Sequence, residues 1–257
     1  MRFAAAAAIM VPLFIRRIRA LPRRELLVGI ALGGLYGLAQ ILQTEGLAHT
    51  SASVSGFITG MYVVFTPLLT AALLRERVPA VTWLAVVLAA AGLGVLSLTG
   101  VAFGLGESIT LVAALLYAVH IIVLGRSSTA SNAVALSAVQ LAVIAVICVL
   151  GALPGGVVLP HTPGQWAVVA YMVVAASITA VLVQTWAQAH MSAVRAAIVM
   201  TFEPVFAALF AVLAGGESVT ARMVLGGGLI VAAMYVVELA PARRGPPAEV
   251  LHHDGGA

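Results

Sequence analysis

The dominant feature of this sequence is a succession of long apolar segments with almost no charge inside them. A helix needs about 20 predominantly apolar residues to cross a bilayer. Nine such segments, the first of them shorter, cover residues 2–15, 26–45, 53–74, 80–99, 106–125, 132–152, 165–189, 193–214 and 221–240. A soluble domain carries about 25% charged residues, whereas only 9% of these 257 residues are charged. Because so few charges cannot cover a surface that faces water, we predict an all-α polytopic membrane protein with about nine transmembrane helices in a lipid bilayer.

The thirteen basic residues are all arginine, and most lie at the ends of the apolar segments. This placement is typical of topology signals and not of a nucleic-acid-binding surface. If the nine segments alternate in direction, one side of the membrane receives Arg16, Arg17, Arg19, Arg23, Arg24, Arg75, Arg77, Arg126, Arg195, Arg243 and Arg244. The other side receives only Arg2 and Arg222. Because cytoplasmic loops are enriched in arginine, we expect a multi-pass protein of the cell inner (plasma) membrane with a cytoplasmic C-terminus.

Part of the sequence is repeated at an offset of 141 residues. QTEGLAHTSA at 43–52 aligns without gaps to QTWAQAHMSA at 184–193, and thirteen of the 42 positions from 43 to 84 are identical to their counterparts. The matching apolar segments would cross the membrane in opposite directions. This indicates an inverted-topology repeat, which is common in secondary transporters, with the substrate site near the midplane where the halves meet.

The repeat divides the chain into a first unit, 1–99, and a second unit, 106–240, followed by a tail, 241–257, that we expect to be disordered and cytoplasmic. The second unit has five apolar segments and the first has four, because the partner of 106–125 would lie before Met1. We therefore expect the first unit to lack its N-terminal helix. A start codon assigned too far downstream is the favoured explanation, and a true nine-helix variant is the alternative.

These repeated segments resemble the EamA-type members of the drug/metabolite transporter superfamily. MSAVRAAIVMTFEPVFAALFAVLAGGESVTARMVLGGGLIVAAMYVV, from 191 to 237, is similar to the family pattern of a helix with a mid-membrane proline, a short loop with a glutamate, and a helix rich in small residues. The opening segment resembles the family's second helix. The resemblance implies two inverted five-helix units, ten helices in all, and transport of amino acids, other metabolites or drugs, mostly outward.

The proline of the first unit departs from this pattern. Pro67 lies four residues beyond Val63, the position equivalent to Pro204. We therefore predict that the two halves kink at different depths. The glycines from Gly226 to Gly228, and Ala89 to Gly94 in the matching helix, are expected to permit close helix packing.

Glu203 is the strongest candidate for a functional residue, because it lies near the middle of segment 193–214. An ionised carboxylate at the centre of a helix costs about 2.5–3.5 kcal/mol on insertion, so such residues usually face a cavity, a partner or a pathway. Pro204 removes one helical hydrogen bond and leaves a carbonyl free. We expect Glu203 to contact a substrate amine or a coupling proton. The alternative is a protonated glutamate that holds two helices together. Tyr62 occupies the matching position in the first unit.

Further polar residues lie inside the apolar segments. Gln184, Thr185 and Trp186 match the cluster of Gln43 and Thr44, and Gln40 lies one turn before Thr44 on the same face. They could line a substrate cavity or form hydrogen bonds between helices, and the sequence does not decide between these roles. Tyr117 and His120, one turn apart, could line the same cavity. His120 could change its charge near neutral pH, or it could be a packing residue.

The sequence lacks the motifs that are typical of ATPases, metalloenzymes and serine hydrolases. A Walker loop, an HExxH or CxxC metal motif and a GxSxG nucleophile motif do not occur, so we expect no enzyme, no metal and no cofactor. His49 and His190 recur with the repeat and have no third ligand at a suitable spacing. We favour a secondary active transporter that works by alternating access on a small molecule, with proton coupling and a homodimer as possibilities. An intramembrane enzyme using Glu203 with His120, and a channel or helix-bundle accessory protein, are the alternatives.

Overall fold

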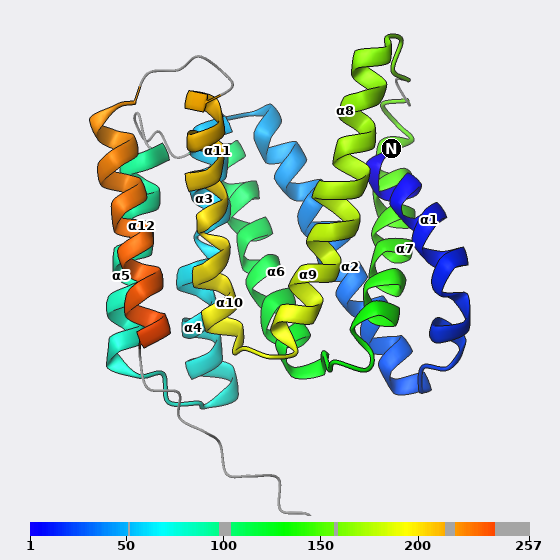
Figure 1. Ribbon diagram of the computed structural model, residues 1–257, viewed down its shortest axis with the longest axis horizontal. Helices are drawn as coiled ribbons and strands as arrows, with labels where there is room; N and C mark the ends of the chain where they lie inside the picture. The colour runs from blue at the N-terminus through cyan, green and yellow to red at the C-terminus, as the bar shows by residue number, and fades with distance from the viewer. Residues whose placement is uncertain (51, 98–103, 157–158, 214–218, 240–257) are drawn as a thin grey trace, which may run out of the picture.

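The computed structural model describes residues 1–50, 52–97, 104–156, 159–213 and 219–239, and the regular elements in these ranges are all helices (Figure 1). They are α1 (Arg2–Arg19), α2 (Arg23–Ala48), α3 (Ala52–Gly60), α4 (Tyr62–Leu74), α5 (Ala80–Ser97), α6 (Leu105–Ser127), α7 (Ala133–Ala152), α8 (Pro163–Val173), the π-helix η1 (Val174–Thr179), α9 (Ala180–Gln188), α10 (Ala193–Met200), α11 (Phe202–Leu213) and α12 (Ala221–Leu239). The prediction of an all-α fold is confirmed.

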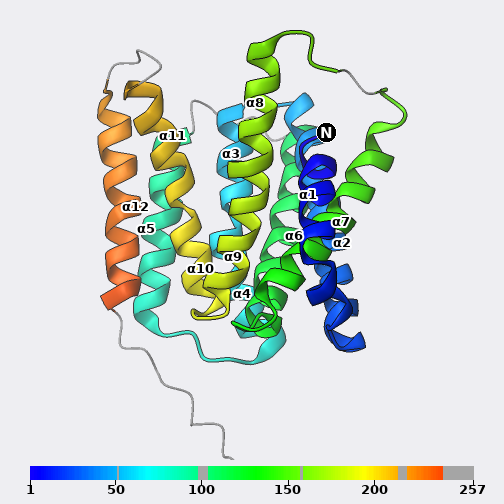
Figure 2. The same cartoon turned by 45° about the vertical axis from the view of Figure 1, so that its right-hand side comes forward.

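The helices form a bundle of columns, where a column is one helix or several helices that continue one another. Consecutive columns run in opposite directions (Figures 1 and 2). α3 and α4 continue one another, as do α10 and α11, and η1 joins α8 to α9. Within the described part of the chain this makes nine columns, the number that the sequence predicts. Their ends lie within a few residues of the predicted ends, and the largest difference is α1, which continues to Arg19. Pro22, whose backbone is extended, lies directly before α2, which begins at Arg23.

The bundle has the dimensions and the outer surface of a membrane protein. In the part of the chain that the structure describes, five helical stretches are long and apolar enough to cross a bilayer: Arg23–Ala48, Val54–Leu74, Leu105–Ser127, Ala133–Ala152 and Pro163–Gln188. α5 and α12 are apolar as well but shorter. Large apolar side chains such as Leu73, Tyr171 and Leu213 are exposed. A surface of this kind suits contact with lipid.

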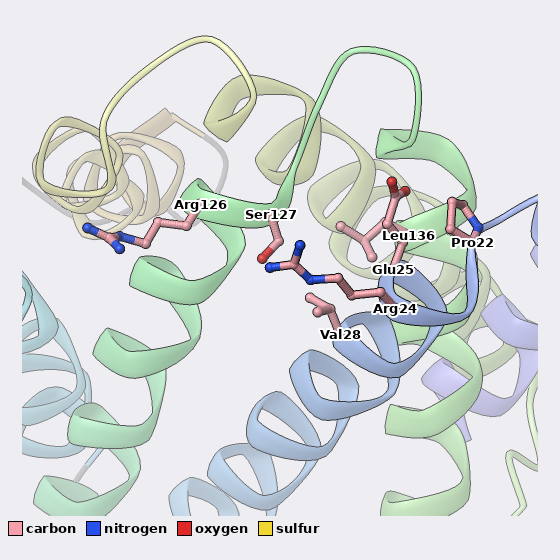
Figure 3. Close-up of a pocket in the computed structure, with 7 residues that line it drawn as sticks. All are labelled: Pro22, Arg24, Glu25, Val28, Arg126, Ser127 and Leu136. Atoms are coloured by element: carbon pink, nitrogen blue, oxygen red, sulfur yellow. The ribbon is translucent and has the colours of Figure 1, made fainter. Parts of the chain in front are cut away.

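The arginines gather at one end of the bundle, the lower end in Figure 1, which we call the arginine-rich end. It carries Arg16, Arg17, Arg19, Arg23, Arg24, Arg75, Arg77, Arg126 and Arg195. Arg126 forms an ion pair with Glu76 there. A pocket of about 270 Å³ opens at this end, lined by Pro22, Arg24, Glu25, Val28, Arg126, Ser127 and Leu136 (Figure 3). Glu217, Arg243, Arg244 and the predicted tail 241–257 lie outside the described residues.

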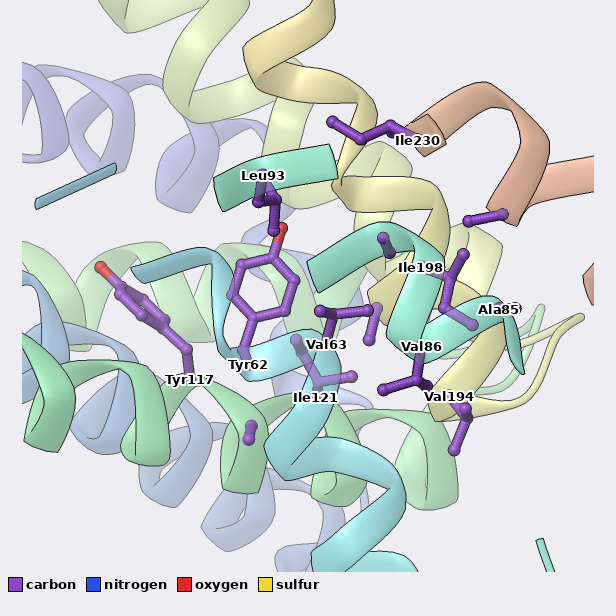
Figure 4. Packing of buried hydrophobic residues seen from close by; sticks show 14 of the residues in the cluster. Tyr62, Val63, Ala85, Val86, Leu93, Tyr117, Ile121, Val194, Ile198 and Ile230 are labelled. Atoms are coloured by element: carbon purple, nitrogen blue, oxygen red, sulfur yellow. The ribbon is translucent and has the colours of Figure 1, made fainter. Parts of the chain in front are cut away.

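The last helices of the two sequence units, α5 and α12, pack directly against one another (Figure 1). A Cβ atom on Gly92 would lie 2.7 Å from the carbonyl oxygen of Gly226, so only glycine permits this approach. The close packing predicted for these glycine-rich segments is therefore present. The adjoining core contains Tyr62, Tyr117 and Ile198, from α4, α6 and α10 (Figure 4).

Two columns are interrupted at the same depth. α3 ends before Met61 (φ −62°, ψ −9°), and α10 ends before Thr201 (φ −67°, ψ −6°). At the offset of 141 residues, Met61 corresponds to the residue after Thr201, so the breaks are one residue apart. The prediction that the halves kink at different depths is therefore wrong.

The physical reason is that Pro67 does not set the break in the first half. It lies well inside α4, and the Thr66 hydroxyl in the preceding turn donates to the carbonyl of Tyr62 at 2.7 Å. Pro204 instead lies in the first turn of α11, where backbone N–H groups have no helical partner to lose. The position of the proline therefore differs between the halves, whereas the position of the break does not.

Candidate functional site

Glu203 lies in the first turn of α11, directly after the break at Thr201. Its side chain is exposed, and no hydrogen bond or ion pair joins it to another described residue. Its neighbours Phe202 and Val205 pack against the buried cluster that contains Tyr62 and Tyr117. The segment that carries Glu203 therefore borders the core, while the carboxylate itself is exposed.

Tyr62, the repeat counterpart of Glu203, begins α4 just after the break at Met61. It shares a buried cluster with Tyr117 of α6 (Figure 4). The two breaks thus bring a tyrosine from one half and a carboxylate from the other to the same level of the bundle. The Pro204 backbone lies beside Glu203 in α11, and its side chain is outside the described set.

A group of hydrogen-bonded side chains, which we call the central polar cluster, extends from Tyr117 toward the end of the bundle opposite the arginine-rich end. It consists of Arg2, Gln40, Gln43, Thr44, Thr59 and Tyr117, from α1, α2, α3 and α6. The Tyr117 hydroxyl donates to Gln43 Oε1 at 3.0 Å and approaches Gln40 Oε1 at 3.5 Å. Gln43 Nε2 donates to Thr59 Oγ1 at 3.1 Å. The predicted residues Gln40, Gln43 and Tyr117 are therefore brought together.

Tyr36 of α2 connects this cluster to the interior. Its ring meets the ring of Tyr117 edge to face at a centroid distance of 5.3 Å, and that of His120 at the same distance. Such edge-to-face contacts contribute about 0.5–1.5 kcal/mol beyond burial. Tyr36 was not among the predicted residues. Its position one turn before Gln40, on the same face of α2, was the signal that could have found it.

A second polar group is buried between α6, α7 and α9. His120 Nε2 is 2.9 Å from Gln140 Oε1, and Gln140 Nε2 donates to Thr185 Oγ1 at 3.4 Å. The backbone carbonyl of Thr185 also accepts a bond from the Ser128 hydroxyl at 2.6 Å. We call His120, Gln140, Thr185 and Ser128 the buried polar network. Since all of these side chains are buried, they join helices and do not line an open surface.

The remaining predicted residues lie elsewhere. Trp186 is 57% exposed, and its ring lies 4.8 Å from that of His190, its neighbour one turn on. Gln184 is partly buried and makes no hydrogen bond to a described residue. Neither side chain joins the central polar cluster. Among the described residues, no group of three or more His, Cys, Asp or Glu side chains is placed to hold a metal ion.

One family model matches most of the chain, and a relative and a solved structure are similar to it as well. The model of the EamA-like transporter family matches residues 1–98 and, again, residues 104–239. An uncharacterized transporter from Archaeoglobus fulgidus is 28% identical over 219 residues, which cover 82% of this chain and 68% of that protein. A protein of known crystal structure has the same fold, with a TM-score of 0.76 and 19% identity, over 93% of this chain and 85% of its own.

Proposed function

The chain belongs to the EamA-like transporter family and is a multi-pass membrane protein, and on this premise we propose that it is a secondary active transporter. It exports small organic metabolites, amino acids or drugs by alternating access. The two inverted halves rock around the central polar cluster and Glu203. The arginine-rich end lies in the cytoplasm of the cell, because cytoplasmic ends carry the excess of arginine, and the membrane is the plasma membrane.

The observation that carries this proposal is the position of Glu203 and its lack of a bonded partner among the described residues. Glu203 is a carboxylate at mid-depth, next to a helix break. A carboxylate in that position is costly unless it binds something. An ammonium group of a substrate and a proton are the two partners that neutralise it. If the two compete for Glu203, outward transport of substrate is coupled to inward movement of protons.

The alternative functions have less support from the geometry. An intramembrane enzyme would need Glu203 and His120 to converge on one substrate. His120 instead contacts Gln140 and Tyr36, inside the buried polar network. A channel would need a continuous polar path. The core residues Tyr62, Val63 and Ile121 are buried and packed together at the level below the central polar cluster.

The substrate has to be found before the mechanism can be tested. An untargeted comparison of metabolites between cells with and without the protein identifies compounds whose export depends on it. Transport of such a compound into inverted membrane vesicles is then measured with and without a proton gradient. A transporter of this kind accumulates the compound above its external concentration, whereas a channel only equilibrates it.

We predict that Glu203→Gln reduces gradient-driven accumulation by at least about tenfold, since one lost charged contact is worth roughly 1.5–3 kcal/mol. Glu45→Gln is the matched control, because Glu45 is an exposed carboxylate near the end of α2 that contacts only His49 among the described residues. Wild-type transport by Glu203→Gln, with an unchanged pH profile and equal amounts in the membrane, would contradict the role given to Glu203.

A further inference from the structure

The pocket at the arginine-rich end is separate from the central polar cluster. Its walls come from the beginning of α2, the end of α6 and the beginning of α7, and its volume is about 270 Å³ (Figure 3). Ligand pockets commonly measure about 300–1,000 Å³, so this one suits a small chemical group. Two of its lining residues, Val28 and Leu136, pack in one apolar cluster with the buried Leu32 and Leu124. Gln40 of the central polar cluster lies about three turns further along α2, so the apolar cluster separates the two sites.

Arg24 supplies a cation to this pocket. Its guanidinium group lies beside Ser127 (Figure 3), and it forms no hydrogen bond, ion pair or ring contact with another residue that the structure describes. Arg126, which also lines the pocket, is instead paired with Glu76. A guanidinium group has five N–H donors and can bind a phosphate through two parallel hydrogen bonds. Arg24 therefore offers the pocket a group that binds phosphate.

Glu25 places a carboxylate in the same pocket, and its orientation is fixed. Asn132 Nδ2 donates to Glu25 Oε2 at 3.0 Å and to the carbonyl oxygen of Ser127 at 3.1 Å. The backbone N–H of Thr129 donates to Asn132 Oδ1 at 2.8 Å and so holds the amide in turn. Glu25 forms no ion pair within the described ranges. A carboxylate accepts up to about four hydrogen bonds, so Glu25 has room for a cationic donor.

Apolar side chains connect the pocket to the lipid-facing surface of α2. Leu27 lies one turn beyond Arg24, and Ile30 lies nearly one turn beyond Leu27. Their side chains are 55% and 43% exposed. A molecule whose polar group occupies the pocket can therefore lay a hydrocarbon chain along α2, whereas a water-soluble compound gains nothing from these side chains. This favours a lipid as the ligand.

The pair of opposite charges restricts the headgroup of that lipid. Basic pockets between membrane helices commonly bind anionic headgroups. In this pocket a headgroup with only negative charge would leave the Glu25 carboxylate without a partner, which is unfavourable. A choline headgroup has no N–H group to donate and is typically held by aromatic rings. None of the seven lining residues is aromatic.

We propose that this pocket binds the phosphoethanolamine headgroup of a membrane phospholipid. Arg24 binds the phosphate, with the Ser127 hydroxyl as a neighbouring donor, and Glu25 accepts from the ammonium group. The bound headgroup joins the beginning of α2 to the end of α6, next to the pair of Arg126 and Glu76. This assignment adds a lipid site to the molecule and does not depend on the proposed transport function.

The first test measures lipid binding to the purified protein by native mass spectrometry. The phospholipids share their acyl chains and carry ethanolamine, choline or glycerol headgroups. The wild type should bind the ethanolamine lipid at least about tenfold more tightly than the other two, as expected for one additional charged hydrogen bond. Glu25→Gln should bind the ethanolamine lipid no more tightly than the glycerol lipid.

The arginine variants test the phosphate contact. Arg24→Gln should weaken binding of the ethanolamine lipid by about tenfold to a hundredfold, and Arg24→Lys should retain part of it. Arg23→Gln is the matched control, because Arg23 is an exposed arginine in the same turn of α2 that does not line the pocket. It should bind like the wild type. Equal unfolding temperatures of all variants without added lipid show that the fold is unchanged.

The second test asks whether the ligand is a lipid or a soluble molecule. Glycerophosphoethanolamine, which has the same headgroup and no acyl chains, competes with the ethanolamine lipid for the wild-type protein. It should bind at least about tenfold more weakly, because each buried CH₂ group of an acyl chain adds to the affinity. The ethanolamine lipid should also raise the unfolding temperature of the wild type more than that of Arg24→Gln.

Three outcomes overturn the inference. Equal binding of the three lipids by the wild type contradicts the assigned headgroup. Arg24→Gln or Glu25→Gln that binds the ethanolamine lipid like the wild type contradicts the assigned contacts. Glycerophosphoethanolamine that binds as tightly as the lipid contradicts a lipid ligand. None of these outcomes affects the proposed transport function, which is tested at Glu203.

Discussion

The dipeptide Gln-Thr occurs at equivalent positions of the two halves and lies in opposite environments. In α2, Gln43 is partly buried and bonded to Tyr117 and Thr59, within the central polar cluster. In α9, Thr185 is fully buried and bonded to Gln140, while its neighbour Gln184 has no hydrogen-bond partner among the described residues. One pair belongs to a surface that can contact a ligand, and the other belongs to a network that joins helices.

The helices that carry the two pairs explain the difference. α2 is a continuous α-helix, with Tyr36 below Gln43. Its counterpart contains η1, a π-helical turn in which the Ser177 hydroxyl donates to the carbonyl of Met172 at 2.9 Å. Ser177 is the residue equivalent to Tyr36 at the offset of 141. A π-turn contains an extra residue, so it changes which residues beyond it face each neighbour. An identical sequence in two inverted halves therefore does not imply an identical role.

The largest effect on stability is expected from Gln140→Leu. It leaves the buried His120 ring without a hydrogen-bond partner, since Gln140 is the partner of Nε2 and Nδ1 has none within the described structure. The cost should be about 1–3 kcal/mol of unfolding free energy. Thermal unfolding of the purified protein in lipid nanodiscs measures it. Transport per folded molecule should remain near the wild-type level. A large loss of transport without a loss of stability would place this network in the substrate site.

A glutamine-to-leucine change in the first half, Gln43→Leu, should instead affect transport more than stability. Gln43 connects Tyr117 to Thr59 in the partly exposed central polar cluster. Its removal should reduce transport by about tenfold, the equivalent of one hydrogen bond of about 1.4 kcal/mol. The unfolding temperature should fall less than in Gln140→Leu. Vesicle transport, normalised to folded protein, provides the measurement. Equal losses of stability in both variants would remove the distinction between the two regions.

The smallest effects are expected at the two predicted residues that the structure leaves outside both groups. Gln184→Leu repeats the substitution at a glutamine without a hydrogen-bond partner among the described residues, and Trp186→Ala removes an exposed ring. Both changes should alter stability by no more than about 0.5 kcal/mol, as surface substitutions usually do. Transport should remain at the wild-type level. If transport falls severalfold in Trp186→Ala, the ring contacts the substrate in another state of the transport cycle.

Much of the fold was predictable because it depends on local properties of the chain. The number and length of the columns follow from the apolar runs. The positions of their ends follow from the arginine, proline and glycine residues between the runs. The arginines gather at one end because consecutive helices alternate in direction. Gln40, Gln43 and Tyr117 were predicted as site residues because polar groups inside apolar helices need partners.

Other features depend on contacts between distant helices and were not predictable. The breaks at Met61 and Thr201 lie at nearly the same depth, although Pro67 and Pro204 do not occupy equivalent positions of the repeat. Arg2 was interpreted as a topology signal, and only the α1–α2 hairpin shows that its charge lies beside Gln40.

Sequence alone thus determined that the chain is a helical membrane protein with a carboxylate at mid-depth, because hydrophobicity and charge act residue by residue. Only the tertiary structure decided which polar residues form the central polar cluster and which form the buried polar network. That choice depends on the direction in which each side chain points, and a single π-turn or helix break changes it.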